Sequence, residues 1–324
     1  MQYAFMVQKG RLEIEAIFLV ESMLRNAKIP SEYIIAFYPK ATDLWDTDPT
    51  PSMVTMDYLS DNNIQIRILE NEHFGSTYPH SNKIYAIRQS EGNALTFIDT
   101  DTFFLRPLKI CNLAGSVRLR RGGGTFPVKN DRFTGTDVWE SLYAIFDVPP
   151  ANNLIQSNGV QKVMPMPYYN AGTIMLDDPA GFGDIYLDTA IKIYENPPQQ
   201  MHSQPILPFL DQIALPIAIS RAGKAVKFLD KTVNTFDSIV DAQLWHYHYM
   251  PRLLLEGTQK YGSAVSDIID DPHVNRLVAT DPLFVLWSSD RARKAYKRIV
   301  SDMNGIEDPN FLIKALRQKV GIVR

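Results

Sequence analysis

The stretch that decides the fold is ALTFIDTDTFFLRPL, residues 94–108. Its apolar run, residues 94–98, predicts a buried strand, and Asp99 and Asp101 follow directly after it. Because side chains of an extended chain alternate between faces, both carboxylates are predicted to leave this strand on the same side. Two like charges at one point indicate a cation held between them, a carboxylate in covalent chemistry, or an accidental spacing.

A second Asp-Thr-Asp triplet, residues 46–48, lies in the segment ATDLWDTDPTPS. Its content of Pro, Thr and Asp is typical of a loop. We therefore interpret Asp46 and Asp48 as surface residues. What distinguishes Asp99 and Asp101 is the strand before them, since the triplet alone carries little information.

Strand and helix signals alternate through the first hundred residues. Strands are predicted at residues 3–8, 31–39, 63–71 and 94–98, and helices at residues 11–28 and 80–92. This alternation predicts a parallel, doubly wound α/β sheet, whose ligands bind beyond the carboxyl ends of the strands. Further along, residues 168–179 predict a strand, and residues 209–220 a helix broken or kinked at Pro216.

The chain is predicted to form a catalytic domain over residues 1–250 and a helical C-terminal extension over residues 251–324. Residues 291–324 hold nine Lys or Arg against three Asp or Glu, which favours a solvated helix face over docking on an anionic membrane or acceptor.

Composition narrows the class of protein. The 324 residues are 45% hydrophobic and 21% charged, as in ordinary globular proteins. The net charge of −3 gives no general attraction to nucleic acid. The single cysteine, Cys111, excludes an internal disulfide framework, and no apolar run resembles a signal peptide or a membrane span. We expect a cytoplasmic enzyme or binding protein.

A cluster of arginines precedes three glycines in VRLRRGGG, residues 117–124. The arginines are Arg118, Arg120 and Arg121. We favour a hairpin turn with solvated charges over an anion-binding loop, because no helix follows to supply an N-terminus.

Paired carboxylates favour a hard divalent cation, and an added imidazole tilts the choice slightly from Mg²⁺ toward Mn²⁺. His246 and His248 lie two residues apart in an aromatic stretch, and either is a candidate ligand or a stacking residue. Lys83 lies sixteen residues before Asp99 and is placed to reach a diphosphate.

Together these features resemble the GT-A-fold glycosyltransferases, and most closely glycosyltransferase family 8. The order that carries the resemblance, over roughly residues 3–250, is Asp-x-Asp after a strand, the upstream lysine, Asn-Ala-Gly at residues 170–172, Asp-Gln at residues 211–212, and His-Tyr at residues 246–247. The resemblance implies a mixed, mainly parallel sheet flanked by helices.

The resemblance also implies the following site residues. Asp99 and Asp101 would bind Mn²⁺ or Mg²⁺, with His246 as the third ligand and His248 as the other candidate. Lys83 would contact the donor's diphosphate, and Gln8 and Lys9 would lie at the nucleotide. Asn170, Gly172, Asp211 and Gln212 would line the sugar and acceptor. As catalytic helpers, Asp177, Asp178 and Asp211 all remain candidates.

Two departures from the family pattern stand out. Val7-Gln8-Lys9 replaces the small-residue pattern after the first strand, and Tyr249-Met250-Pro251-Arg252 replaces the Gly and Lys-Pro-Trp after the histidine.

Taken with the resemblance, the sequence predicts a metal-dependent transferase that moves a hexose from a UDP-linked donor to a saccharide or glycolipid acceptor.

Two alternative functions come from the same residues. A haloacid-dehalogenase-type phosphatase would also use Asp-x-Asp after a strand, with Asp177-Asp178 as its second pair. Against it stand Phe103, where that family has Thr or Val, and the long chain before the motif. The other alternative is a catalytically idle nucleotide-sugar-binding protein on the same scaffold.

Overall fold

The structure is a computed structural model that describes residues 1–109, 112–121, 126, 135–149, 168–236, 239–279 and seven isolated positions between 284 and 298 (residues 284, 285, 288, 289, 294, 295 and 298). Its strands are β1 Gln2–Met6, β2 Ile34–Pro39, β3 Gln65–Leu69, β4 Ala94–Ile98, β5 Thr102–Phe104, β6 Ser116–Arg121, β7 Tyr169–Asp177, β8 Ala225–Phe228 and β9 Leu244–His246. Its helices are α1 Arg11–Arg25, α2 Met53–Asp61, α3 Asn82–Arg88, α4 Gly135–Ala144, α5 Pro179–Glu195, α6 Leu210–Arg221, α7 Met250–Tyr261, α8 Ser263–Ile269 and α9 Pro272–Val278.

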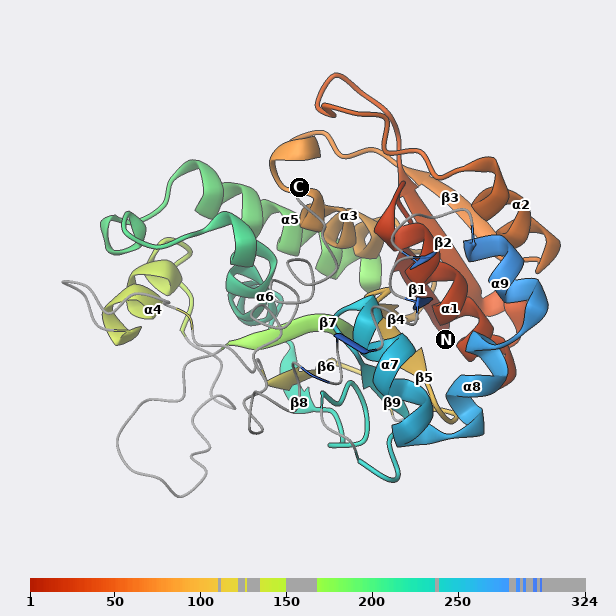
Figure 1. Cartoon of the computed structure of the whole chain (residues 1–324). Coiled ribbons are helices and arrows are strands. Elements are labelled where there is room, and N and C mark those ends of the chain that lie inside the picture. Colours follow the sequence, from red (N-terminus) through yellow and green to blue (C-terminus); the bar gives the residue numbers. More distant parts are fainter. Residues whose placement is uncertain are drawn as a thin grey trace.

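The strands form a mixed, mainly parallel sheet in the order β3-β2-β1-β4-β7-β6-β8 (Figure 1). β7 is antiparallel to both of its neighbours, β4 and β6, whereas the other pairs in this sheet are parallel. The prediction of a mainly parallel sheet flanked by helices is confirmed. The prediction from the residues alone of a fully parallel sheet is wrong at β7.

The reversed direction of β7 matters for the site. Ile98 at the end of β4 pairs with Thr173, and Ala94 at its start pairs with Asp177. The beginning of β7 therefore lies at the carboxyl end of β4, together with Asn170 and Gly172. Asp177 lies at the opposite end of β7, about 14 Å from Thr173 along the strand at 3.4 Å per residue.

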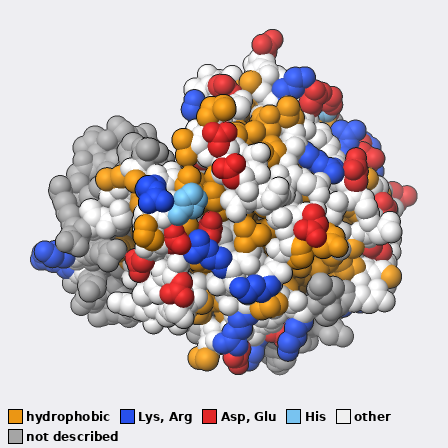
Figure 2. Space-filling view, turned by 90° about the vertical axis from the view of Figure 1, so that its right-hand side faces the viewer, with side chains coloured by type: hydrophobic (Ala, Val, Ile, Leu, Met, Phe, Trp, Pro, Cys, Tyr) orange, Lys and Arg blue, Asp and Glu red, His pale blue; other side chains and the backbone are white. Residues whose placement is uncertain are grey.

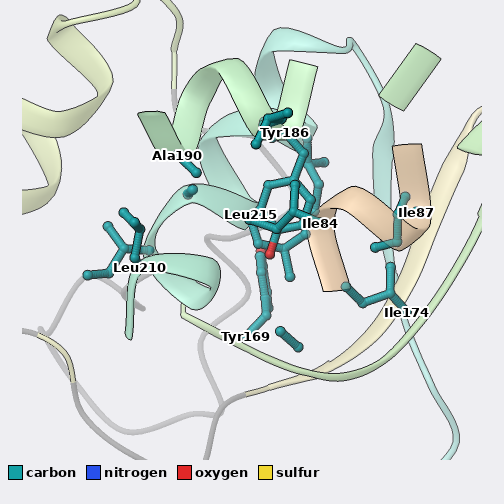
Figure 3. Close-up of a cluster of buried hydrophobic side chains, with 14 of the residues drawn as sticks. Ile84, Ile87, Tyr169, Ile174, Tyr186, Ala190, Leu210 and Leu215 are labelled. Atoms are coloured by element: carbon teal, nitrogen blue, oxygen red, sulfur yellow. The ribbon is translucent and has the colours of Figure 1, made fainter. Parts of the chain in front are cut away.

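Alternating side chains of the sheet face two hydrophobic cores. In β1, Tyr3 and Phe5 belong to one buried cluster and Ala4 and Met6 to the other, as the alternation of strand side chains requires. The second cluster is covered by α3, α5 and α6. Figure 3 shows this packing with Ile84 and Ile87 of α3, Tyr186 and Ala190 of α5, Leu210 and Leu215 of α6, and Tyr169 and Ile174 of β7.

The first core joins α1 to the C-terminal helices. Phe18 of α1 lies in the same buried cluster as Leu253 of α7, Ile268 of α8 and Val274 of α9. Apolar burial, the main stabilising term in folding, thus ties the last described helices to the N-terminal part of the chain. The division of the chain at residues 250 and 251 stays a prediction.

A two-stranded sheet brings the histidines to the Asp-x-Asp segment. β5 pairs with β9 antiparallel, and Thr102 lies opposite His246. The chain turns at Thr100 and Asp101 between β4 and β5, so the aspartates are placed by a turn and not by the strand alternation predicted from the sequence.

Helix predictions are confirmed in position but differ in detail. α6 is one helix with Pro216 inside it, so of the predicted break or kink the break is absent. Ser81 precedes α3, but its hydroxyl donates to the Tyr78 carbonyl and does not cap the helix. The predicted turn at residues 122–124 lies outside the described residues, as does nearly all of the basic segment 291–324.

On the face drawn in Figure 2, Lys and Arg side chains gather at the lower edge, at the height where Figure 1 places β8 and β9.

None of the helices in the described ranges is both long and apolar enough to cross a membrane.

Candidate active site

The site begins where β4 ends against the start of β7. The Asp99 backbone N–H donates to the Gly172 carbonyl oxygen at 2.7 Å. A side chain at residue 172 would crowd this point, because an added Cβ would lie 2.8 Å from Cε1 of His246 and 3.1 Å from Oδ2 of Asp99. Glycine at this position lets the aspartate and the histidine approach the same strand.

A chain of hydrogen bonds fixes the orientation of His246. The Asn170 Oδ1 accepts from the Gly172 N–H and from the Asn234 amide nitrogen, both at 2.9 Å. The Asn234 Oδ1 is thereby left facing Nδ1 of His246, also at 2.9 Å. Asn234 is fully buried. Since an amide oxygen only accepts, Nδ1 of His246 carries a proton.

This tautomer has a consequence at the other ring nitrogen. Nε2 of His246 lies 3.1 Å from Oδ1 of Asp101. In a neutral imidazole protonated on Nδ1, Nε2 is a lone-pair acceptor, and the carboxylate oxygen is an acceptor too. Two acceptors face each other stably only when a proton or a metal ion lies between them. Burial alone would raise the pKa of Asp101, but with a proton between the two groups the charge and hydrogen bond of His246 outweigh burial and hold this pKa below its usual range.

His248 lies on the other side of His246. Ligand atoms of Asp101, His246 and His248 all lie within 4.8 Å of one another. Burial, reinforced by the charge of His246, lowers the pKa of His248 to about 3, so its imidazole is neutral and able to bind a metal at neutral pH. The φ of His248 is +64°, a left-handed conformation that is strained for a residue other than glycine.

Asp99 has different partners from Asp101. The Lys83 Nζ lies 3.0 Å from both carboxylate oxygens of Asp99 and 3.1 Å from Oδ2 of Asp211. Burial opposes the charge of Lys83, but the two carboxylates outweigh it and raise its pKa. Burial is also the largest influence on Asp99 and raises its pKa. Lys83 thus holds together the end of β4 and the start of α6.

Asp211 is held on both of its carboxylate oxygens. The Tyr78 hydroxyl donates to Oδ1 at 2.7 Å, and Lys83 binds Oδ2. Burial favours the neutral acid, but the charges of Lys83 and His80 and these hydrogen bonds lower the pKa of Asp211. An ionised carboxylate with both oxygens occupied positions Lys83 and is poorly suited to take up a proton.

Behind Asp101 lies a buried carboxyl group that sequence reasoning missed. Glu15 of α1 is fully buried, accepts a hydrogen bond from Arg11 at 2.7 Å and accepts one from the Thr100 hydroxyl at 3.1 Å. The spacing of Arg11 and Glu15 on a helix is the signal that could have suggested the pair. The pair anchors the turn that carries Asp101.

A cavity of about 290 Å³ opens beside these groups. Its walls come from the end of β1, the start of α1, the region of α3 and the aspartate turn. The lining residues are Met6, Gln8, Lys9, Arg11, Leu12, Pro79, His80, Asn82, Lys83, Asp99, Thr100 and Asp101. The structure therefore brings the predicted Gln8, Lys9, Lys83 and both aspartates together around one space.

Two other predicted residues lie elsewhere or are only near the site. Asp177 binds Lys224 and the Gly115 N–H at the opposite edge of the sheet, so it does not join the cluster around Asp101. Gln212 follows Asp211 in the first turn of α6 and is partly exposed.

Arg252, in the segment that departs from the family's Lys-Pro-Trp pattern, is buried and donates to the Phe236 carbonyl. It does not line the cavity beside the aspartates.

Comparison with known proteins identifies the family. Residues 3–223 match the family described as "Rhodobacterales glycosyltransferase domain". The chain belongs to this family, and it is therefore a glycosyltransferase. No curated protein matches the chain. The phosphatase alternative is wrong. Besides the family match, it would require Asp177 and Asp178 beside Asp99 and Asp101, whereas Asp177 lies at the other end of β4, opposite Ala94.

Solved structures of glycosyltransferases are also similar to the chain. The galactosyltransferase LgtC, in complex with donor and acceptor sugar analogues, has 10% identity and a TM-score of 0.46, with 87% of this chain and 96% of that one covered. The bifunctional glycosyltransferase WbbM has 14% identity and a TM-score of 0.47 over 89% of this chain, which spans about half (51%) of that protein. Mouse xyloside xylosyltransferase 1 has 10% identity and a TM-score of 0.43, with coverages of 76% and 96%. The family match, and not these likenesses, identifies the chain as a glycosyltransferase.

Proposed function

We propose that this protein is a metal-dependent hexosyltransferase, most like glycosyltransferase family 8. The donor is a UDP-linked hexose, the ion is Mn²⁺ or Mg²⁺, and the acceptor is a saccharide or glycolipid. The observation that carries the proposal is the 3.1 Å approach of Oδ1 of Asp101 to Nε2 of His246, beside a cavity that Asp101 lines together with Lys9, Arg11 and Lys83.

The residues at this point fit a divalent cation. Asp101 and His246 would hold it, with His248 as the neighbouring imidazole and Asp99 as the second carboxylate. Oxygen and imidazole ligands suit Mn²⁺ and Mg²⁺, and Mn²⁺ accepts the imidazole more readily. Asn234 supports this assignment, because a ligating histidine commonly donates its other ring N–H to a fixed oxygen.

The charges around the cavity fit a diphosphate. Lys9, Arg11 and Lys83 line it beside Asp99 and Asp101, and Arg11, which pairs with Glu15, lies in the first turn of α1. In transfer from a sugar nucleotide, negative charge builds on the departing diphosphate, and fixed cations stabilise that charge. A bound Mn²⁺ or Mg²⁺ adds to this effect as a Lewis acid. We assign to Arg11 the place that the family's missing lysine leaves open.

The remaining predicted residues have positioning functions in this proposal. Lys83 is fixed by Asp99 and Asp211 before any donor binds, so little reorganisation accompanies its contact with the phosphates. Gln8 and Lys9 contact the nucleotide, and Gln8 is held by the Asn82 amide at 3.2 Å. Asn170 and Gln212 line the sugar side. Attack by the acceptor hydroxyl from the leaving group's own face needs no protein nucleophile.

The cytoplasmic location and a peripheral membrane contact through residues 291–324 stay predictions, as does the division into residues 1–250 and 251–324.

Donor turnover in the variant Asp101→Asn tests the proposal. An asparagine amide can donate to Nε2 of His246, so the variant is expected to fold, while metal-dependent release of UDP from UDP-hexoses falls at least about 100-fold. The matched control is Asp46→Asn, in the other Asp-Thr-Asp triplet. Equal activity of the two variants would remove Asp101 from the site. Metal-dependent UDP binding without turnover, for a panel of saccharide acceptors, would favour the idle binding protein.

A further inference from the structure

A second, larger cavity lies apart from the first. It has a volume of about 910 Å³ and shares none of the lining residues given above. Its floor is formed by β6 and β7, and its walls by the segments after β8, after β5 and before β9. The lining residues are Arg106, Pro107, Lys109, Arg118, Met175, Phe228, Leu229, Asp230, Lys231, Thr232, Val233, Asp241 and Gln243.

The charges of this cavity are predominantly positive. Four of its residues are Lys or Arg and two are Asp, which leaves an excess of two positive charges. Both acids have local partners: Asp241 pairs with Arg106 at 3.0 Å, and Asp230 accepts from the N–H and hydroxyl of Thr232. The space is therefore suited to an anion and not to a cation.

Arg118 is the cation at the floor of the cavity. Its Nε is buried and has no hydrogen-bond partner, and its Nη2 makes one long contact, 3.4 Å, with the Asn112 carbonyl. A buried guanidinium N–H without a partner is costly, and such groups normally have one. A planar guanidinium binds a carboxylate or a phosphate through two parallel N–H groups. Arg118 is one of the three arginines of residues 118–121, whose function the donor site does not explain.

The cavity also has apolar walls. Met175, Phe228 and Val233 contribute apolar surface beside the charged groups. Ligand sites commonly combine apolar walls with a few placed polar groups, and the carbon faces of a sugar ring match this combination. A free inorganic ion would use the charges alone.

Two segments of the chain contribute residues both to this cavity and to the hydrogen bonds around His246. Val233 lines the cavity, and the next residue, Asn234, holds His246. Val117 and Leu119 of β6 face the core covered by α5 and α6, so Arg118 and Arg120 face the other side. Arg120 donates to the Asn234 carbonyl at 2.6 Å. Arg118 thus lies about 7 Å along β6 from Arg120, which contacts Asn234.

We propose that this cavity binds the anionic group of an acidic saccharide acceptor, with Arg118 as the principal contact. The group is a carboxylate, as in a uronic acid, or a phosphate, as in a sugar phosphate. The assignment of the ligand as an acceptor rests on the proposed function, whereas the anion site itself stands on the cavity and on Arg118.

Calorimetric titration of the full chain with three probes tests this proposal. The probes are glucuronic acid, glucose 6-phosphate and glucose, at constant ionic strength. At least one anionic probe is expected to bind at least tenfold more tightly than glucose, and the one that binds identifies the anion. Neither anionic probe exceeding glucose would overturn the proposal.

Variants locate the binding. Arg118→Gln is expected to weaken the anionic probe at least tenfold, and the exposed Lys231→Gln about two- to threefold. The matched control is Arg88→Gln, which removes an arginine paired with Asp184 on α3 and α5, away from both cavities. An unchanged affinity in both cavity variants would overturn the proposal, and Lys231→Gln keeps the test open if Arg118→Gln misfolds.

The same variants separate this proposal from the donor assignment. UDP binding in the presence of Mn²⁺ is expected to be unchanged in Arg118→Gln, because Arg118 does not line the first cavity. A loss of UDP affinity equal to the loss of probe affinity would contradict a separate anion site. Binding of the anionic probe without any UDP binding would leave the anion site in place and remove the donor assignment.

Discussion

Replacing Asn234 by leucine tests how the histidine is held. Asn234 is fully buried, and its Oδ1 lies 2.9 Å from Nδ1 of His246. Leucine has the same branching but is larger and offers no acceptor, so the imidazole N–H loses its partner and the ring loses its fixed orientation. Removing such a supporting partner typically weakens a metal site about 10- to 100-fold, which corresponds to about 1.4–2.7 kcal/mol.

The assay is titration with Mn²⁺ at pH 7, with thermal unfolding of the metal-free protein measured in parallel. The leucine variant is also expected to lose about 1–3 kcal/mol of folding stability, because the His246 N–H is left buried without a partner. Its Mn²⁺ affinity is expected to fall about 10- to 100-fold.

Asn234→Asp is the matched control. It keeps an oxygen facing Nδ1 of His246 and is expected to bind Mn²⁺ at least tenfold more tightly than the leucine variant. A folded leucine variant with the Mn²⁺ affinity of the wild type would refute the reasoning, because the imidazole would then not be a ligand oriented by Asn234.

Three further predictions concern the buried network. Lys83→Met leaves Asp99 and Asp211 without their shared cation and should cost about 3–5 kcal/mol of unfolding free energy in urea titration; a cost near zero would show that the carboxylates take up protons instead. Gly172→Ala places a Cβ 2.8 Å from His246 and should weaken Mn²⁺ binding in a protein that still unfolds cooperatively; wild-type affinity would contradict the close packing. Because the folded-state pKa of Asp211 lies below its ordinary 3.8, the stability it provides is present above about pH 4 and is lost as pH falls below it. Asp211→Asn should remove up to about 1.4 kcal/mol per pH unit of this slope between pH 4 and 3, and an unchanged slope would assign the acid sensitivity to other groups.

The sequence predicted the location of the site because strand signals and polar residues coincide at one point. An apolar run followed by Asp99 and Asp101 indicated the carboxyl end of a strand, and Lys83 preceded it on a helix. Each of these signals is local in the chain. The structure places all three residues around one cavity.

The direction of β7 could not be predicted from local patterns. The residues suggested parallel strands, for which Asp177 at the end of its strand would join Asp99. Pairing of β7 antiparallel to β4 places Asp177 at the far edge and brings Asn170 to the site instead. Strand direction depends on long-range pairing, and short apolar runs carry no signal for it.

Asn234 and the difference between the two aspartates were missed for a related reason. Asn234 lies in an irregular segment, and a backbone bridge between Thr235 and Trp245 of β9 brings it beside His246. The turn at Thr100 directs Asp99 toward Lys83 and Asp101 toward His246. Neither contact follows from the spacing of residues in the sequence.

The central claim is that Asp101 and His246 hold a cation that holds the donor's diphosphate. Calorimetric titration with UDP, with and without Mn²⁺, tests it most directly, with GDP as the comparison nucleotide. We expect UDP to bind only when Mn²⁺ is present, and GDP to bind more weakly. Equal UDP affinity with and without the metal, or no binding of either nucleotide, would contradict the claim.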